Sequence, residues 1–247
     1  MFRFAQCTFA FVMLAIAAHP SIARAAEPVD LLLVLAADVS RSIDEPKFQL
    51  QREGYATAVS HPRVLNAIAS GPNQRIAICF VEWSGPSAQK VVIDWTLIGD
   101  AGAARRFSDH LLEAPRSFAD GTSISGAIDF AASLFNQAPY ESSRYAIDVS
   151  GDGNNNSGRD ITAARNDALA KGIVINGLVI LTEDQASRHP AHTNPPGGLE
   201  DYYRNNVIGG PGAFVIVARD FDSFGEAILK KMITEIAQLP PLQQRKR

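Results

Sequence analysis

The sequence predicts an α/β fold with a doubly wound, mainly parallel six-stranded sheet, one antiparallel edge strand and helices on both faces. Apolar runs typical of buried strands alternate along the chain with helical stretches, and this alternation indicates a parallel sheet covered by helices. Two of the expected strands, 75–83 and 89–96, are joined by the short turn at 84–87. Because a parallel crossover needs a dozen or more residues, this short link predicts an antiparallel pair.

Each element is justified by its local pattern. The first strand is an unbroken apolar run without a helical period, which is typical of a strand buried on both faces. Asp44 is suited to cap the first helix and Gly172 to end the fourth, and the last helix has an amphipathic apolar spacing. The expected strands are 30–37, 75–83, 89–96, 145–150, 173–181 and 214–218. The expected helices are 44–60, 100–113, 123–136, 160–171 and 221–239.

The first 25 residues are typical of a secretory signal peptide. Arg3 supplies a positive charge, residues 4–18 are apolar, and Ala23-Arg24-Ala25 fits the small-residue cleavage pattern. The apolar run is shorter than the roughly 20 residues that a spanning helix needs, so cleavage is expected rather than anchoring. We therefore expect a periplasmic or secreted protein with a folded domain at 26–240 and a basic tail at 241–247.

The charge and cysteine content exclude some classes of partner and of stabilisation. The chain has 23 Lys and Arg against 26 Asp and Glu, a net charge of −3 at pH 7. Nothing in this balance attracts nucleic acid or an anionic membrane surface. Only Cys79 lies outside the signal peptide, so the mature chain can form no internal disulfide, and its apolar surroundings predict core packing.

Three oxygen-rich loops lie beside expected strands and helices. They are Asp38-Val39-Ser40-Arg41-Ser42, Asp120-Gly121-Thr122-Ser123 and Ser150-Gly151-Asp152-Gly153. A single loop of this kind would indicate helix capping, because Ser, Asp and Gly are common cap and turn residues. Open α/β sheets bind ligands at the carboxyl ends of their strands, so we expect the three loops to meet there. Hydroxyl and carboxylate oxygens suit a hard cation such as Mg²⁺.

In these motifs the chain resembles von Willebrand factor A-type domains that carry a metal-ion-dependent adhesion site. It matches their Asp-x-Ser-x-Ser at Asp38, Ser40 and Ser42, their Gly-Thr loop at Thr122 and their last Asp at Asp152. The resemblance implies that the two Ser and the Thr bind the cation directly, and that the two Asp act mainly through water. The cation, Mg²⁺ or else Mn²⁺ or Ca²⁺, would bridge to a carboxylate of a protein or peptide partner.

Two details of the resemblance leave alternatives open. The last Asp of the family commonly follows a Ser or Thr directly, whereas Gly151 stands between Ser150 and Asp152 here, and Asp148 inside the strand is the alternative. Glu82 ends a neighbouring strand and could approach the rim of the site, although an edge-exposed Glu is the simpler interpretation.

More narrowly, the chain is similar to secreted proteobacterial A-domain proteins classed as a domain of unknown function. The similarity lies in residues 38–44, 148–153 and 206–214. It supports the fold and leaves the biology open.

Two other binding sites fit the third loop less well. Asp152, Asn154 and Asn156 occupy positions one, three and five of an EF-hand loop, but Ser157 and Ala163 stand where Gly and Glu are needed. A dinucleotide-binding loop would need Gly where Asn156 stands, and the Asp would repel a pyrophosphate.

The residue pattern does not predict an enzyme. Ser40 or Ser42 could be imagined as a nucleophile, but no Gly-x-Ser-x-Gly elbow is present and the sequence places no His beside them. Metal-assisted hydrolysis and a structural role with a vestigial site remain alternatives. In the longest irregular stretch, 182–212, Pro190 argues against a helix that would bring His189 and His192 to one face. Surface histidines are expected there rather than a transition-metal site.

Overall fold

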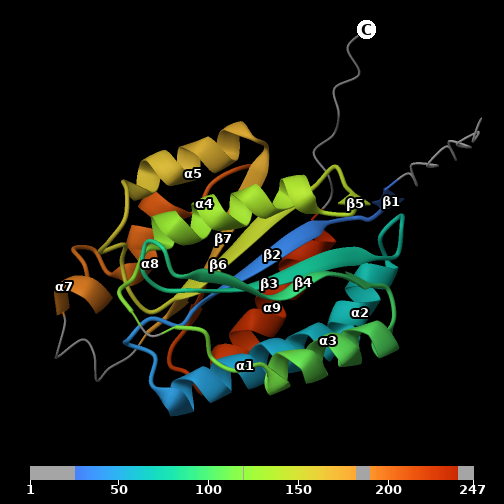
Figure 1. The fold of residues 1–247 in the computed structure, drawn as a ribbon, viewed down its shortest axis with the longest axis horizontal. Helices are drawn as coiled ribbons and strands as arrows, with labels where there is room; N and C mark the ends of the chain where they lie inside the picture. Colours follow the sequence, from blue (N-terminus) through green and yellow to red (C-terminus); the bar gives the residue numbers. More distant parts are fainter. Residues whose placement is uncertain (1–25, 119, 182–189, 239–247) are drawn as a thin grey trace, which may run out of the picture.

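A six-stranded sheet in the order β4-β3-β2-β6-β7-β8 runs through the centre of the molecule (Figure 1). The computed structural model describes residues 26–118, 120–181 and 190–238. The strands are β2 (Leu32–Asp38), β3 (Ile76–Trp83), β4 (Gln89–Ile98), β6 (Tyr145–Gly151), β7 (Ile173–Ile180) and β8 (Val215–Ala218). All neighbours pair in parallel except β3 and β4, which are antiparallel. The predicted fold class is confirmed.

Helices cover both faces of this sheet, as Figure 1 shows. One face carries α1 (Glu45–Ser60), α2 (Pro62–Ala69), α3 (Ala101–Glu113) and α9 (Phe224–Ala237). The other carries α4 (Ile124–Leu134), α5 (Ile161–Ala170), α8 (Leu199–Tyr202) and the π-helix η2 (Tyr203–Val207). The 3₁₀ turn η1 (Phe135–Gln137) extends α4, and the short helix α7 (Pro190–Thr193) precedes α8.

The central strand β2 shows why the sheet needs two helical layers. Leu33 and Leu35 pack into the core on the α1 side, whereas Leu32, Val34 and Ala36 pack on the α4 side. All seven residues of β2 are buried. A strand with apolar side chains on both faces is stable only when helices cover both of them. The predicted burial of the first strand on both faces is therefore confirmed.

Aspartates begin three of the helices. The side chains of Asp44, Asp100 and Asp160 accept hydrogen bonds from the main chain of the first turns of α1, α3 and α5. Each bond satisfies an N–H group that has no partner inside the helix. Asp44 is thus the cap that the sequence predicts.

Several short elements were not predicted. They are α2, the two-stranded parallel pair of β1 (Glu27–Pro28) with β5 (Tyr140–Glu141), and the helices of the 182–212 stretch. Pro190 begins α7 instead of preventing a helix, because proline lacks an N–H that the first helical position does not need. His189, the predicted signal peptide at 1–25 and the predicted tail at 241–247 lie outside the described residues.

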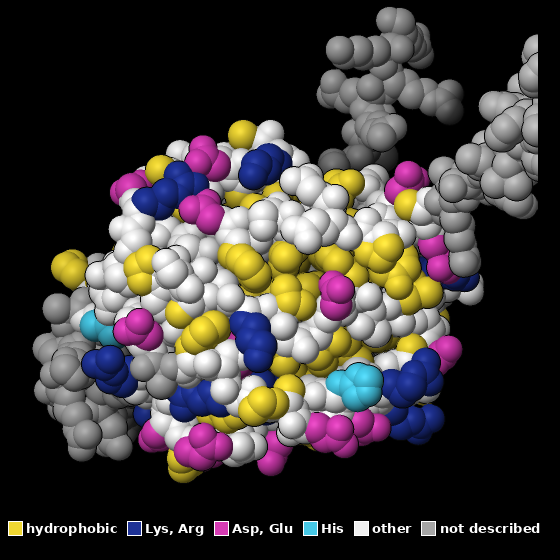
Figure 2. All heavy atoms as spheres, in the orientation of Figure 1, with side chains coloured by type: hydrophobic (Ala, Val, Ile, Leu, Met, Phe, Trp, Pro, Cys, Tyr) yellow, Lys and Arg dark blue, Asp and Glu magenta, His cyan; other side chains and the backbone are white. Residues whose placement is uncertain are grey.

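The antiparallel strand β4 forms one edge of the sheet. Figure 2 shows hydrophobic side chains gathered over the middle of this face of the molecule. Val91 and Leu97 of β4 are only partly buried, while Lys90 and Asp94 are exposed on the same strand. Charged side chains on an edge strand disfavour pairing with a strand of another chain. None of the described helices has the length and apolar character needed to cross a bilayer.

A buried charged cluster lies between β6 and α9. The ammonium of Lys231 is 2.7 Å from Asp148 Oδ1 and 2.7 Å from Glu235 Oε1, and all three side chains are buried. Burial raises the pKa of Asp148 to about 7, although Lys231 opposes this shift and Glu235 adds to it. Asn176 donates to Glu235 at 2.7 Å. The carboxylates of Asp148 and Glu235 therefore share the ammonium of Lys231 between the sheet and α9.

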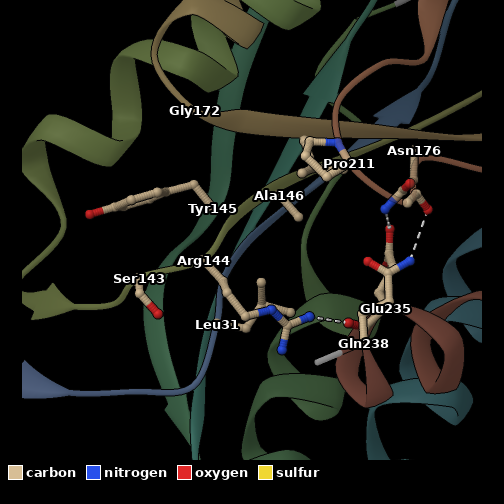
Figure 3. Close-up of a pocket in the computed structure, with 12 residues that line it drawn as sticks. Leu31, Ser143, Arg144, Tyr145, Ala146, Gly172, Asn176, Pro211, Glu235 and Gln238 are labelled. Atoms are coloured by element: carbon tan, nitrogen blue, oxygen red, sulfur yellow. Dashed lines mark hydrogen bonds between the residues drawn. The ribbon is translucent and has the colours of Figure 1, made fainter. Parts of the chain in front are cut away.

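A cavity of about 320 Å³ adjoins this cluster at the amino ends of β6 and β7 (Figure 3). Arg144, Asn176 and Glu235 line it. The Arg144 guanidinium donates to the carbonyl of Glu235 at 2.5 Å and so holds the last turn of α9. The cavity is at the end of the sheet opposite the oxygen-rich loops.

Candidate functional site

The carboxyl ends of β2 and β6 bring two of the three oxygen-rich loops together. The strands are parallel neighbours, so Asp38 at the end of β2 lies near Asp152, which follows β6. Ser42 Oγ donates to Asp152 Oδ1 at 2.6 Å and lies 3.0 Å from Ser40 Oγ. Asp38 Oδ1 accepts from the main-chain N–H of Ser40 at 2.7 Å. Four of the five predicted site residues therefore form one hydrogen-bonded group.

Main-chain bonds join the second loop to the other two. The N–H of Arg41 donates to the carbonyl of Asp120 at 2.9 Å, and the N–H of Asn156 donates to the carbonyl of Thr122 at 3.0 Å. Ser123 caps α4 by accepting from Gly126, which fixes the start of that helix directly after Thr122. All three loops thus meet at the carboxyl edge of the sheet.

Thr122 differs from the other predicted residues in its side-chain contact. It is buried, and its hydroxyl lies 3.3 Å from Nε2 of His192. Among the described residues, the side-chain hydroxyl of Thr122 therefore contacts a histidine and not the other predicted site residues. The structure therefore adds a histidine to the site that the sequence placed among surface residues.

Three of the buried oxygen atoms that have no hydrogen-bond partner among the described residues lie around Gly151. They are Asp38 Oδ2, Asp152 Oδ2 and the hydroxyl of Tyr203. Burial, and then the negative charge of Asp152, raise the pKa of Asp38 to about 8. Burial also raises the pKa of Asp152. The two carboxyl groups are neighbours and are shielded from water. A bound cation would stabilise their ionised forms, because its positive charge would offset the repulsion between them.

Gly151 is required by the close approach of Tyr203. A β-carbon at position 151 would lie 2.7 Å from the Tyr203 hydroxyl and 3.0 Å from Asp38 Oδ2, so both atoms lie close to this one point. The extra residue between Ser150 and the loop Asp is thus the place where the tyrosine reaches the site. Burial, and then the charges of Asp38 and Asp152, raise the pKa of Tyr203 well above its usual value, so the phenol keeps its proton.

The alternative carboxylate, Asp148, does not belong to this site. It is inside β6, on the face covered by α9, where Lys231 pairs with it.

Glu82 is neither edge-exposed nor at the rim, so both interpretations of it were wrong. It is fully buried and paired with Arg52 at 2.5 Å, and it accepts from the N–H of Ser117 at 2.9 Å. A buried carboxylate needs such partners to offset the loss of water. Glu82 therefore fixes the chain that leads into the second loop.

Arg116 holds the first loop from outside, and sequence reasoning missed it. Its guanidinium lies within hydrogen-bond distance of the carbonyl oxygens of Val39, Ser40 and Ile43, and it also donates to Phe118. The delocalised, rigid guanidinium suits several acceptors at once. No local pattern marks this residue, because its partners in the first loop are more than 70 positions away.

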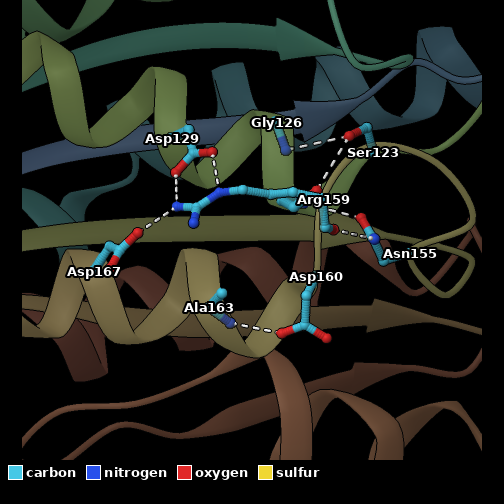
Figure 4. Close-up of polar contacts among 9 residues, drawn as sticks. Ser123, Gly126, Asp129, Asn155, Arg159, Asp160, Ala163 and Asp167 are labelled. Atoms are coloured by element: carbon cyan, nitrogen blue, oxygen red, sulfur yellow. Dashed lines mark hydrogen bonds and ion pairs between the residues drawn. The ribbon is translucent and has the colours of Figure 1, made fainter.

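The third loop is held by its own side chains (Figure 4). Arg159 donates to both carboxylate oxygens of Asp129 on α4, at 2.7 and 2.6 Å, and lies 2.7 Å from Asp167 on α5. Asn155 accepts from the N–H of Ser125 at 3.0 Å, and its amide donates to the carbonyl of Arg159 at 3.2 Å. The loop that follows Asp152 is thus tied to the two helices beside it.

The donor set fits a divalent cation. Adjacent oxygens in an octahedron with bonds of 2.0–2.1 Å are about 2.9 Å apart, close to the 3.0 Å between the hydroxyls of Ser40 and Ser42. Among the described residues, no group of three or more His, Cys, Asp and Glu is placed to hold a metal ion. The predicted site has only two such residues and otherwise depends on hydroxyls. Its residues would hold the ion through Ser and Thr oxygens and two carboxylates.

Comparisons with known proteins identify the fold. A profile of the family described as "Protein of unknown function (DUF1194)" matches residues 28–240. No curated protein matches the sequence. Solved structures of similar fold are von Willebrand factor A domains, as the sequence resemblance suggested.

Three structural relatives illustrate the similarity. Proximal thread matrix protein 1 from the mussel byssus superposes with a TM-score of 0.63 at 12% identity, over 86% of this chain and 48% of that protein. The pilus adhesin SpaC from Lactobacillus rhamnosus GG gives 0.56 at 17% identity, over 87% and 30%. A von Willebrand factor type A protein from Catenulispora acidiphila gives 0.52 at 16% identity, over 85% and 43%. The chain spans about half or less of the length of these proteins.

One further structure bears on the metal. The byssus protein has also been solved "with zinc occupied MIDAS motif", and this structure matches with a TM-score of 0.59 at 14% identity, over 86% of this chain and 49% of that one.

Proposed function

The chain belongs to the DUF1194 family of proteins of unknown function, and from this premise we propose that it is an exported, divalent-cation-dependent protein-binding module. Ser40, Ser42 and Thr122 bind the cation directly, while Asp38 and Asp152 hold its water shell. The cation bridges to an acidic group of a protein or peptide partner, in adhesion or assembly. The protein is not an enzyme.

The observation that carries this proposal is the pair of buried carboxyl groups with unpartnered oxygens. Asp38 Oδ2 and Asp152 Oδ2 have no hydrogen-bond partner among the described residues, and both residues are fully buried. Leaving such groups unpaired is costly in a protein interior. A hydrated cation would offer each oxygen a hydrogen-bond donor, and its positive charge would offset their mutual repulsion.

The structural relatives support the class of function. One is named a pilus adhesin and another a thread matrix protein, and the latter holds zinc at its metal-ion-dependent adhesion site. By analogy, a bound cation supplies positive charge with one coordination position left for an outside carboxylate. In this proposal the chain's own residues fix the ion and leave that position to the partner.

Metal titration calorimetry on the full-length chain tests the cation site. We expect Asp38→Ala and Thr122→Ala to abolish or strongly weaken Mg²⁺ and Mn²⁺ binding while circular dichroism stays unchanged, because the core lies beneath the loops. Asp109→Ala, at an exposed position on α3, is the matched control and should bind as the wild type. Equal metal affinity in the wild type and Asp38→Ala would contradict the proposal.

The partner is tested by affinity capture from an envelope extract. Captured protein should depend on Mg²⁺, disappear with a chelator and be absent with Asp38→Ala. Capture that ignores the chelator would contradict a metal bridge. Metal binding without a metal-dependent partner, but with hydrolysis of a test ester, would favour the alternative of a metal-assisted hydrolase. Loss of all metal binding in the wild type would leave a structural domain with a vestigial site.

A further inference from the structure

The ring of Tyr203 lies in a groove that two glycines leave open. Gly177 is in β7, and Gly151 ends the neighbouring strand β6. A β-carbon at Gly177 would lie 2.9 Å from Cδ1 of the ring, and one at Gly151 would lie 2.7 Å from the hydroxyl, which is closer than real β-carbons approach. Side chains at these two positions would therefore displace the tyrosine. The body of the ring lies beside β7, and the hydroxyl lies beside the end of β6.

Packing alone does not explain why this residue is a tyrosine. Tyr203 is fully buried, and its hydroxyl has no hydrogen-bond partner among the described residues. A buried hydroxyl without a partner costs free energy, because it has lost its hydrogen bonds to water. Phenylalanine would fill the same groove without this cost. The hydroxyl therefore indicates a role at the site beside it, where Asp38 Oδ2 lies 3.0 Å from the same point next to Gly151.

The unpartnered oxygens around Gly151 are one donor and two acceptors. The phenol of Tyr203 keeps its proton and can donate a hydrogen bond, whereas Asp38 Oδ2 and Asp152 Oδ2 can accept one. A buried water typically makes about three hydrogen bonds to polar groups of this kind. One water would accept from the phenol and donate one hydrogen to each carboxylate. Its remaining lone pair would be free to bind a cation.

From this geometry, and resting on the proposed cation site, we propose that Tyr203 is a positioning residue that fixes one water of the cation's shell between Asp38 and Asp152. The phenol donates to the oxygen of this water and does not itself bind the ion. Mg²⁺ keeps several of its waters when a protein binds it, and each ordered water carries a cost in entropy. A donor that is already in place lowers this cost, so Tyr203 raises the affinity for the hydrated ion.

The π-helix η2 holds Tyr203 in this position. The N–H of Ile208 donates to the carbonyl of Tyr203 at 3.0 Å, five residues back along the chain, which is the bond of a π-turn. Such turns are rare and occur frequently at functional sites. The hydroxyl of the adjacent residue, Tyr202, accepts from the N–H of Asn155 at 3.2 Å. The segment that supplies the phenol is therefore tied to the loop that supplies the second carboxylate.

Calorimetric titration of the full-length chain with Mg²⁺ tests the proposal. Tyr203→Phe removes only the hydroxyl and should lower Mg²⁺ affinity by about tenfold, because outer partners of metal sites are worth roughly 10- to 100-fold. Tyr55→Phe is the matched control, since Tyr55 is equally buried but its hydroxyl donates to Ser150 Oγ at 2.9 Å. The control should bind Mg²⁺ as the wild type does. Wild-type affinity in Tyr203→Phe would overturn the inference.

Thermal unfolding in chelator separates this role from a structural one. Tyr203→Phe should not lower the melting temperature, because the hydroxyl has no protein partner to lose among the described residues, whereas Tyr55→Phe should lower it. Added Mg²⁺ should then stabilise Tyr55→Phe as much as the wild type and Tyr203→Phe less. A Tyr203→Phe protein that is destabilised in chelator and gains as much as the wild type from Mg²⁺ would have lost a structural contact only, and the inference would be wrong.

A spectroscopic measurement reports on the phenol directly. Nuclear magnetic resonance of protein labelled with ¹³C at Cζ of its five tyrosines follows the hydrogen bonding of each hydroxyl. The resonance that is absent from Tyr203→Phe should shift when Mg²⁺ is added to the wild type, and the resonance that is absent from Tyr55→Phe should stay in place. A wild-type protein that binds Mg²⁺ without a shift of the Tyr203 resonance would contradict the proposed contact.

Failure of this inference and failure of the proposed function give different results. If Asp38→Ala binds Mg²⁺ as the wild type does, the oxygen site itself is wrong and the inference falls with it. If Asp38→Ala loses Mg²⁺ while Tyr203→Phe keeps wild-type affinity, the oxygen site stands and only the role of Tyr203 is refuted.

Discussion

The guanidinium nitrogen Nη2 of Arg116 donates to the carbonyl oxygen of Val39 at 2.8 Å, across 77 positions of sequence. The same nitrogen is 3.1 Å from the carbonyl of Ser40 and 2.7 Å from that of Ile43. The positively charged guanidinium of Arg116 thus holds the backbone that carries the Ser40 and Ser42 hydroxyls. The guanidinium of Arg116 bonds to main-chain carbonyl oxygens and not to the two hydroxyls, so it supports the loop without taking up the proposed metal ligands.

We expect Arg116→Lys to lower Mg²⁺ affinity by about tenfold, because supports of metal ligands are commonly worth that much and lysine lacks the planar fork. Metal titration calorimetry measures the change. Arg105→Lys, exposed on α3, is the control for loss of a guanidinium at the surface. An Arg116→Lys protein with unchanged Mg²⁺ affinity would show that the first loop keeps its geometry without the guanidinium.

Asp38→Asn should stabilise the protein when metal is absent. The variant removes a buried carboxyl whose ionisation is opposed by burial and by the charge of Asp152, and which has an unpartnered oxygen. In chelator its melting temperature should rise by a few degrees. With Mg²⁺ the wild type should gain stability and Asp38→Asn should not. Thermal unfolding in chelator and in Mg²⁺ measures both effects, with Asp109→Asn as the control. If the wild type and Asp38→Asn gain the same stability from Mg²⁺, the proposed metal site is wrong.

Gly151→Ala should destabilise the fold by about 1–3 kcal/mol through overpacking. The new methyl group would lie 2.7 Å from the Tyr203 hydroxyl and 3.0 Å from Asp38 Oδ2. Tyr203→Phe removes the first of these contacts, so the double variant should recover part of the loss. Gly99→Ala is the control, because its β-carbon would make only ordinary contacts at 3.5 Å or more. Strictly additive effects of the two substitutions in denaturant unfolding would argue against this contact.

The stability of the protein should fall as the pH rises from about 4 to about 7, with a contribution from Asp148. Burial raises its pKa from 3.8 in the unfolded chain to about 7 in the fold, so the folded state holds the proton more tightly. Its contribution is complete below pH 4 and is lost as the pH rises through 7, on the order of a few kcal/mol. Asp148→Asn should flatten this part of the curve. Urea unfolding at several pH values measures it, and an unchanged slope would refute the assignment; Asp222→Asn is the exposed control.

The sequence was sufficient for the fold where the information is local. The apolar run of β2, the short link before β4 and the cap at Asp44 each depend on residues close together in the chain. Boundaries differ by a few residues, because helix ends depend on packing as well as propensity. The helix α2 was missed because it begins at Pro62, only two residues after α1 ends.

The site was only partly predictable for the same reason. Its hydroxyl and carboxylate loops are contiguous motifs, and the parallel sheet brings them together. Arg116, Tyr203 and His192 reach the site from distant positions with no surrounding pattern, so their roles depend on tertiary contacts. The length of the stretch at 182–212 was the one sequence feature that indicated a purpose there.

The clamp between Arg159 and the two helices beside it has a kinetic consequence. Because the loop after Asp152 is already held at both Asp129 and Asp167, an incoming ion has little chain to order. The slow step of ion capture would then be the loss of water from the ion and not the closing of a loop. Mg²⁺ gives up its water reluctantly, so it would enter more slowly than a larger cation of the same charge.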